Sequence, residues 1–147
     1  SSNRWVSQLA REDARAKLLV TLPGIGDFFA VLLAVEIDKV GRFSRPQKLA
    51  AYAGLVPSTY ASGGYVHHGR ITKRGNKWIR WACIEAAHPA IRQDRDLAAL
   101  YDRLKAAKGA NVAKVAVAKR LLTIAYRVLS EGRAYRPAEE QAALRRR

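Results

Sequence analysis

The sequence predicts a mainly α-helical, compact domain with a helix-hairpin-helix motif and a glycine-rich loop or small β-hairpin. Apolar residues recur at helical spacing along most of the chain, and capping residues and glycines separate these runs. Only residues 58–72 combine several glycines with β-branched side chains. At 147 residues, one core can bury about 68–70% of the unfolded surface.

The N-terminal part predicts two helices joined by a tight turn. A helix over 5–20, capped by Ser2 or Asn3, is expected because apolar and charged residues alternate at helical spacing. The sequence Pro23-Gly24-Ile25-Gly26 then favours a turn, and Asp27 is expected to cap a buried helix over 28–37. Residues 13–37 therefore form the predicted helix-hairpin-helix.

The middle of the chain predicts a short helix followed by an irregular segment. Ser44 is expected to cap this helix, with Pro46 in its first turn, and Gly54 is expected to end it after Tyr52. Pro57 breaks the pattern, and residues 57–76 are predicted as a loop that carries chemistry.

Three further helices are expected over residues 77–132. Asn76 is expected to cap the first, over 77–92, which Pro89 should kink or shorten. The second spans 96–108 and ends at Gly109. Asn111 opens the third, which continues until Gly132.

The charge balance points to a polyanionic partner. The chain has 27 Lys and Arg against 12 Asp and Glu, a net charge of +15. No acidic residue occurs between Lys39 and Ile84. The cations there are Lys39, Arg42, Arg45, Lys48, Arg70, Lys73, Arg74, Lys77 and Arg80. A merely solvated surface normally mixes both signs, so this segment predicts contact with a nucleic-acid backbone.

Two motifs are candidates for phosphate chemistry. The backbone of Gly24, Ile25 and Gly26 precedes a helix start, where amides can donate to phosphate, although a plain interhelical turn explains the same pattern. Ser58 and Ser62, the latter beside Gly63 and Gly64, are candidate nucleophiles near several cations. Both serines also suit a simple turn. Tyrosines are the alternative nucleophiles: Tyr52, Tyr60, Tyr65 and Tyr126.

No metal site or membrane segment is expected in this chain. His67, His68 and His88 lack further ligands at suitable spacing. The one cysteine, Cys83, lies among apolar neighbours and is expected in the core. We expect a cytoplasmic protein, and the lack of methionine suggests a piece of a longer one.

Several motifs in linked order resemble the IS110 family of insertion-sequence transposases, which are related to the Piv DNA invertase. They are Leu22-Pro-Gly-Ile-Gly, Phe43-Ser44, the run Lys48-Leu-Ala-Ala-Tyr-Ala-Gly-Leu-Val-Pro, Ser62-Gly-Gly, and Gly69-Arg-Ile-Thr-Lys-Arg-Gly-Asn through Arg80. The resemblance is dense from about Leu18 to Arg92.

The resemblance implies that residues 1–136 are the C-terminal domain of a two-domain recombinase, followed by a basic tail over 137–147. The absent N-terminal domain would be a RuvC-like DEDD domain that binds magnesium, and this fragment would be inactive alone. In the family a serine forms a covalent bond to DNA, and we carry that role to Ser62, with Ser58 as second choice. Nucleic-acid contacts would fall on Gly24, Ile25, Gly26, Gly63, Gly64, Arg70, Lys73, Arg74, Asn76, Lys77 and Arg80. The implied partners are DNA, a guide (bridge) RNA and further copies of the protein.

Overall fold

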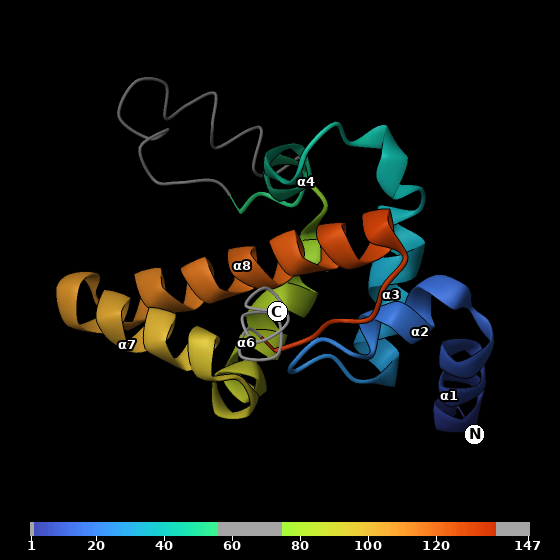
Figure 1. Cartoon of the computed structure of the whole chain (residues 1–147), viewed down its shortest axis with the longest axis horizontal. Helices are drawn as coiled ribbons and strands as arrows, with labels where there is room; N and C mark the ends of the chain where they lie inside the picture. Colours follow the sequence, from blue (N-terminus) through green and yellow to red (C-terminus); the bar gives the residue numbers. More distant parts are fainter. Residues whose placement is uncertain (1, 56–74, 138–147) are drawn as a thin grey trace, which may run out of the picture.

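Seven α-helices and one 3₁₀ turn make up the described part of the computed structural model, residues 2–55 and 75–137, and no strand occurs there (Figure 1). The helices in chain order are α1 (Ser2–Glu12), α2 (Ala14–Leu19), α3 (Asp27–Ile37), η1 (Val40–Arg42), α4 (Pro46–Tyr52), α6 (Lys77–Gln93), α7 (Arg95–Lys108) and α8 (Ala110–Glu131). The prediction of a compact helical domain is confirmed for these residues. The predicted glycine-rich loop or β-hairpin lies almost wholly outside them.

The longest helix, α8, organises the core. It packs against α2, α4, α6, α7 and η1, and it crosses the molecule in Figure 1. Its side chains Val117, Leu121 and Leu122 are buried together with Ile79 of α6 and Leu33 of α3. α8 therefore brings α2, α4 and α6, which are distant in sequence, into one body.

The predicted single helix over 5–20 is wrong, because Asp13 interrupts the helix and separates α1 from α2. This residue has extended backbone angles (φ −80°, ψ 123°), and its carboxylate accepts hydrogen bonds from the amides of Ala16 (3.0 Å) and Arg15 (2.8 Å). These amides, with the nearby Arg15 charge, lower the pKa of Asp13. Asp13 thus ends one helix and caps the next, a local competition that the apolar pattern conceals.

Three other predicted helix starts are also wrong by one or two residues. Gly26 rather than Asp27 precedes α3, and Arg45 rather than Ser44 precedes α4, in both cases without a side-chain cap. Gly109 precedes α8, so Asn111 lies inside its first turn. In each case the helix begins without a hydrogen bond from a capping side chain.

The predicted start of α6 and the predicted end of α8 agree with the structure. Asn76 caps α6 and Gly132 ends α8 in the left-handed conformation, as predicted. Pro89 does not shorten α6, which continues to Gln93. A proline removes one backbone hydrogen bond, whereas the surrounding alanines are fully buried and hold the helix against the core. α7 begins at Arg95, slightly before the predicted start, because Asp94 caps it.

The segment after α8 runs back across the body (Figure 1). The amide of Tyr135 donates to the Thr21 hydroxyl (2.9 Å), and the Tyr135 hydroxyl donates to the carboxylate of Asp94. This segment therefore ties the α2–α3 connection to the junction of α6 and α7. No helix among the described residues is long and apolar enough to cross a membrane.

Candidate nucleic-acid interface

A hydrogen bond joins two described residues that flank the segment with the candidate serines. The amide of Asn76, just before α6, donates to the carbonyl oxygen of Tyr52, the last residue of α4 (2.6 Å). The chain therefore leaves α4 and returns to α6 at nearly the same point. Residues 56–74 lie outside the described residues, and this contact joins two residues that flank them in the sequence.

Asn76 uses both ends of its side-chain amide. Its oxygen accepts from the amides of Trp78 (3.0 Å) and Ile79 (2.9 Å) and so caps α6. Its nitrogen donates to the carboxylate of Glu36 in α3 (2.7 Å). The residue predicted to contact nucleic acid thus joins α3, α4 and α6.

Arg42 completes this joint from η1. Its guanidinium donates to the carbonyl oxygens of Ile37 (3.0 Å) and Glu36 (3.2 Å). The same group lies 4.5 Å from the ring centre of Phe43 and 4.8 Å from that of Tyr52, distances typical of cation–π contacts. We call Glu36, Arg42, Tyr52 and Asn76 the loop clamp.

The clamp also changes the acidity of a phenol. Hydrogen bonding from the Asn76 side chain and from Arg42 lowers the pKa of Tyr52, since both stabilise the phenolate. Tyr126, another candidate nucleophile, donates its hydroxyl hydrogen to the Phe43 carbonyl oxygen (2.9 Å). Tyr60 and Tyr65 lie outside the described residues. Sequence reasoning did not group Glu36 with Asn76, because nothing local links residues 40 positions apart.

The start of α6 brings two of the predicted cations, Lys77 and Arg80, next to the clamp. Lys77 is exposed, with its ammonium 5.2 Å from the Trp78 ring centre, and Arg80 lies one turn later, half-buried. The candidate nucleophilic serines and the other residues predicted to contact nucleic acid near them lie outside the described part of the chain. They are Ser58, Ser62, Gly63, Gly64, Arg70, Lys73 and Arg74.

The predicted phosphate-binding turn packs against α6. Gly24 has φ +77°, and its amide donates to the side-chain oxygen of Gln93 (2.8 Å). A Cβ on Gly24 would lie 2.3 Å from the carbonyl oxygen of Ala86. The amide of Ile25 donates to the Leu22 carbonyl oxygen (3.2 Å). Two of the three amides assigned to phosphate therefore already have protein partners, and the exposed Gly26 lies directly before α3.

The structure also shows the surroundings of the Cys83 thiol and of the possible metal ligands. Cys83 is fully buried, which raises the pKa of its thiol to about 12 and keeps it protonated. Within the described ranges, no three His, Cys, Asp or Glu side chains gather as a metal site would require.

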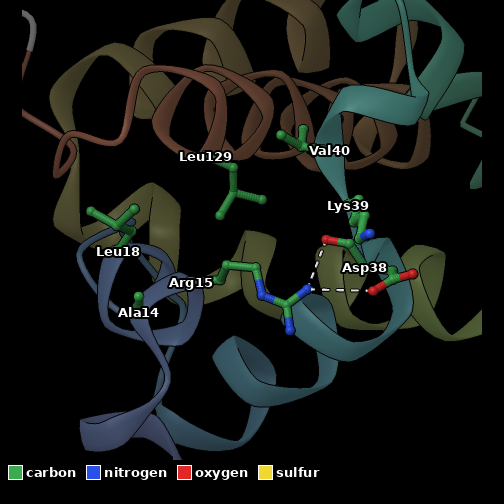
Figure 2. Close-up of a pocket in the computed structure, with 7 residues that line it drawn as sticks. All are labelled: Ala14, Arg15, Leu18, Asp38, Lys39, Val40 and Leu129. Atoms are coloured by element: carbon green, nitrogen blue, oxygen red, sulfur yellow. Dashed lines mark hydrogen bonds and ion pairs between the residues drawn. The ribbon is translucent and has the colours of Figure 1, made fainter.

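An open cleft of about 410 Å³ lies between the N-terminal helices and α8 (Figure 2). Arg15 lies in it and donates to the Asp38 carbonyl oxygen (2.8 Å), with the Asp38 carboxylate 3.7 Å away. The cleft is lined by Ala14, Arg15, Leu18, Asp38, Lys39, Val40 and Leu129. It shares no residue with the loop clamp.

Comparison with known proteins identifies the relatives of this chain. A family model for the transposase IS116/IS110/IS902 family matches residues 16–102. The chain is 32% identical over 142 residues to a probable family 20 transposase of Pseudomonas aeruginosa, a match that covers 91% of this chain and 41% of that protein. It is 31% identical to the putative transposase y4pF/y4sB of Sinorhizobium fredii, covering 92% of this chain and 36% of the relative. It is also 31% identical to the pilin gene-inverting protein of Moraxella bovis, covering 82% and 38%. The chain thus spans about two fifths of the length of these relatives.

Proposed function

The chain belongs to the IS116/IS110/IS902 family of transposases, and from this premise we propose that it binds DNA and supplies a serine nucleophile for DNA strand exchange. The observation that carries the proposal is the loop clamp. It joins residues that flank the serine-bearing segment in the sequence, and it lies at the basic start of α6. A nucleophile needs such a rigid base, because misplacement of a reacting atom by about 1 Å can slow a reaction about 100-fold.

The proposed chemistry is a phosphoryl transfer from DNA to Ser62, with Ser58 as the second candidate. The serine oxygen bonds to phosphorus while the bond between phosphorus and one strand oxygen breaks. The serine gives up its proton, and the departing strand end leaves as a hydroxyl. Neighbouring cations would stabilise the charge that develops on the phosphate. We assign this role to Arg70, Lys73, Arg74, Lys77 and Arg80.

The α2–α3 connection is proposed as a helix-hairpin-helix that anchors a neighbouring backbone. Gly24 and Ile25 stabilise the turn against α6. Phosphate contact would then fall to Gly26 and the first amides of α3, which have no intrahelical partners. In this proposal the turn reads no bases.

Three further parts of the proposal concern the whole protein. A separate DEDD domain would supply magnesium, a guide RNA would read the target by base pairing, and at least two copies would hold the broken duplexes together. Each follows from the resemblance of the motifs to the IS110 family.

The second candidate function is a non-catalytic module that binds nucleic-acid backbone. It is favoured by the structural roles of Asn76 and Gly24, two residues predicted to contact nucleic acid, which here hold the fold together. On this alternative Ser62 is a turn residue and its removal changes little.

A covalent adduct separates the two candidates. A full-length protein that contains this chain is incubated with magnesium, its guide RNA and labelled DNA, and then run on a denaturing gel. We expect the Ser62→Ala variant to lose the protein–DNA adduct, while Ser58→Ala and the control Ser130→Ala, at an exposed position in α8, keep it. An adduct that survives both loop substitutions would move the role to a tyrosine. DNA binding without any adduct, wild type included, would favour the binding module.

A further inference from the structure

Four aromatic rings gather on a surface formed by α3 and α6. Phe29 and Trp81 lie 5.3 Å apart edge to face, Phe28 lies 5.6 Å from Phe29, and Trp78 lies 6.3 Å from Trp81. Three of these residues are about half exposed to solvent: Phe28 is 53% exposed, Trp78 49% and Trp81 43%. We call these four residues the aromatic platform. Large exposed aromatic groups of this kind commonly mark a binding surface.

The platform begins at the loop clamp. α3 and α6 run antiparallel, because Glu36 meets Asn76 at one end of the pair while Phe29 meets Trp81 further along. Trp78 is two residues beyond Asn76, whose oxygen accepts its amide hydrogen. The tryptophans therefore lie next to Asn76, which follows the serine-bearing segment in the sequence.

The charges around the tryptophans favour a nucleic-acid strand as the occupant. The ammonium of Lys77 lies over the Trp78 ring, and no acidic residue occurs from Lys39 to Ile84. Three acidic residues lie around the platform: Asp27 is beside Phe28, Glu85 is one turn after Trp81, and Glu36 lies in the loop clamp, where its carboxylate accepts a hydrogen bond from Asn76. Aromatic faces next to cations are the usual means by which proteins hold unpaired bases.

We infer that the aromatic platform stacks unpaired bases of a DNA strand beside the bond that the enzyme breaks. Bases stack on Trp78 and Trp81, and the adjoining phosphate pairs with Lys77. The inference rests on the proposed function, since strand exchange must unpair bases next to the broken bond.

The test compares single-stranded and duplex DNA. The affinity of the 147-residue chain is measured for a labelled 15-nucleotide oligothymidine and for a duplex of equal length, at fixed salt. We expect Trp78→Leu and Trp81→Leu each to weaken single-strand binding about 5- to 150-fold, the loss typical of one stacked base. Duplex affinity should change less than about twofold. Trp5→Leu is the matched control, because Trp5 is 71% exposed on α1, outside the platform.

A second measurement does not depend on the affinity of the leucine variants. In chains that retain only Trp78 or only Trp81, oligothymidine should quench tryptophan fluorescence, whereas a chain that retains only Trp5 should show no quenching. Circular dichroism melting verifies that each variant folds.

Four outcomes would overturn the inference. They are wild-type affinity in both leucine variants, equal losses for single strand and duplex, a change of oligomeric state without a change in DNA binding, and tighter binding of oligouridine RNA than of DNA. Binding of both DNAs with no effect of the tryptophans would leave the proposed function standing. If the wild-type chain bound neither DNA, both proposals would fail.

Discussion

At the scale of single residues, Gly24 is the position where backbone conformation and packing both exclude a side chain. Its φ of +77° disfavours L-residues, and a Cβ would lie 2.3 Å from the Ala86 carbonyl oxygen. We expect Gly24→Ala to lower the free energy of unfolding by about 2–5 kcal/mol, combining left-handed strain with overpacking. Urea denaturation measures this change.

Gly26 provides the matched control for Gly24, two residues along the same turn. A Cβ there meets nothing within 4 Å. Gly26→Ala should therefore change the free energy of unfolding by less than about 1 kcal/mol. Equal effects of the two substitutions would show that the turn does not depend on the contact with α6.

The two glycines also show what the sequence can predict at this scale. The motif predicts a tight turn with glycines, and the structure agrees. Gly24 lies against Ala86 of α6, which is 62 positions further along the chain. This contact depends on tertiary packing, which no local pattern encodes. The Gly24 amide, one of the three predicted to bind phosphate, thus donates to Gln93.

At the scale of elements, Asn76 stabilises α6 and its junction with α3 and α4. We expect Asn76→Ala to lower the free energy of unfolding by about 1.5–3 kcal/mol, because a helix cap and the hydrogen bond to Glu36 are both lost. Asn111→Ala is the control, since Asn111 is exposed in the first turn of α8 and does not cap it.

Asn76→Asp separates the two contributions of the asparagine. The carboxylate keeps the acceptor for the Trp78 and Ile79 amides but places a negative charge against Glu36. The loss of stability caused by Asn76→Asp should become smaller as the pH falls, because protonation of either carboxylate removes the repulsion between them. A loss that is independent of pH would contradict the contact with Glu36.

Helix boundaries illustrate why elements are predicted unevenly. The sequence predicts that Asn76 caps a helix beginning at Lys77, and the structure agrees. Asp13 lies within a continuous amphipathic run, so the pattern predicts one helix where the carboxylate makes two. At Pro89 the sequence shows the local cost, which is the loss of one backbone hydrogen bond. The buried alanines that offset this loss become visible only in the packed structure.

At the scale of the whole molecule, the sequence predicts chemical character better than spatial grouping. The net charge of +15 and the order of the motifs do not depend on how the helices are arranged. They can therefore be read from the sequence, and the motifs indicate the family. The loop clamp joins residues from four separate segments, and the aromatic platform joins residues of α3 and α6. Their members look ordinary one at a time, which is why sequence reasoning did not find either group.

The segment after α8 closes the molecule through Tyr135. Its hydroxyl donates to the half of the Asp94 carboxylate that does not cap α7, and burial together with this hydrogen bond raises the pKa of Tyr135. We expect Tyr135→Phe to lower the free energy of unfolding at pH 7 by about 1.5–3 kcal/mol, the range for a hydrogen bond to a charged group. Tyr101→Phe, which keeps its ring next to Lys105, is the control.

The raised pKa of Tyr135 also predicts how stability depends on pH. Above pH 10, the usual pKa of tyrosine, the unfolded chain releases a proton that folded Tyr135 retains, so the wild-type free energy of unfolding falls as pH rises. The Tyr135→Phe variant lacks this proton, so its stability should fall less steeply from pH 10 upward. Cys83 is present in both chains, and its ionisation cancels in the comparison. Urea denaturation between pH 7 and pH 11 measures the difference, and parallel curves would show that the hydroxyl of Tyr135 is solvated rather than bound to Asp94.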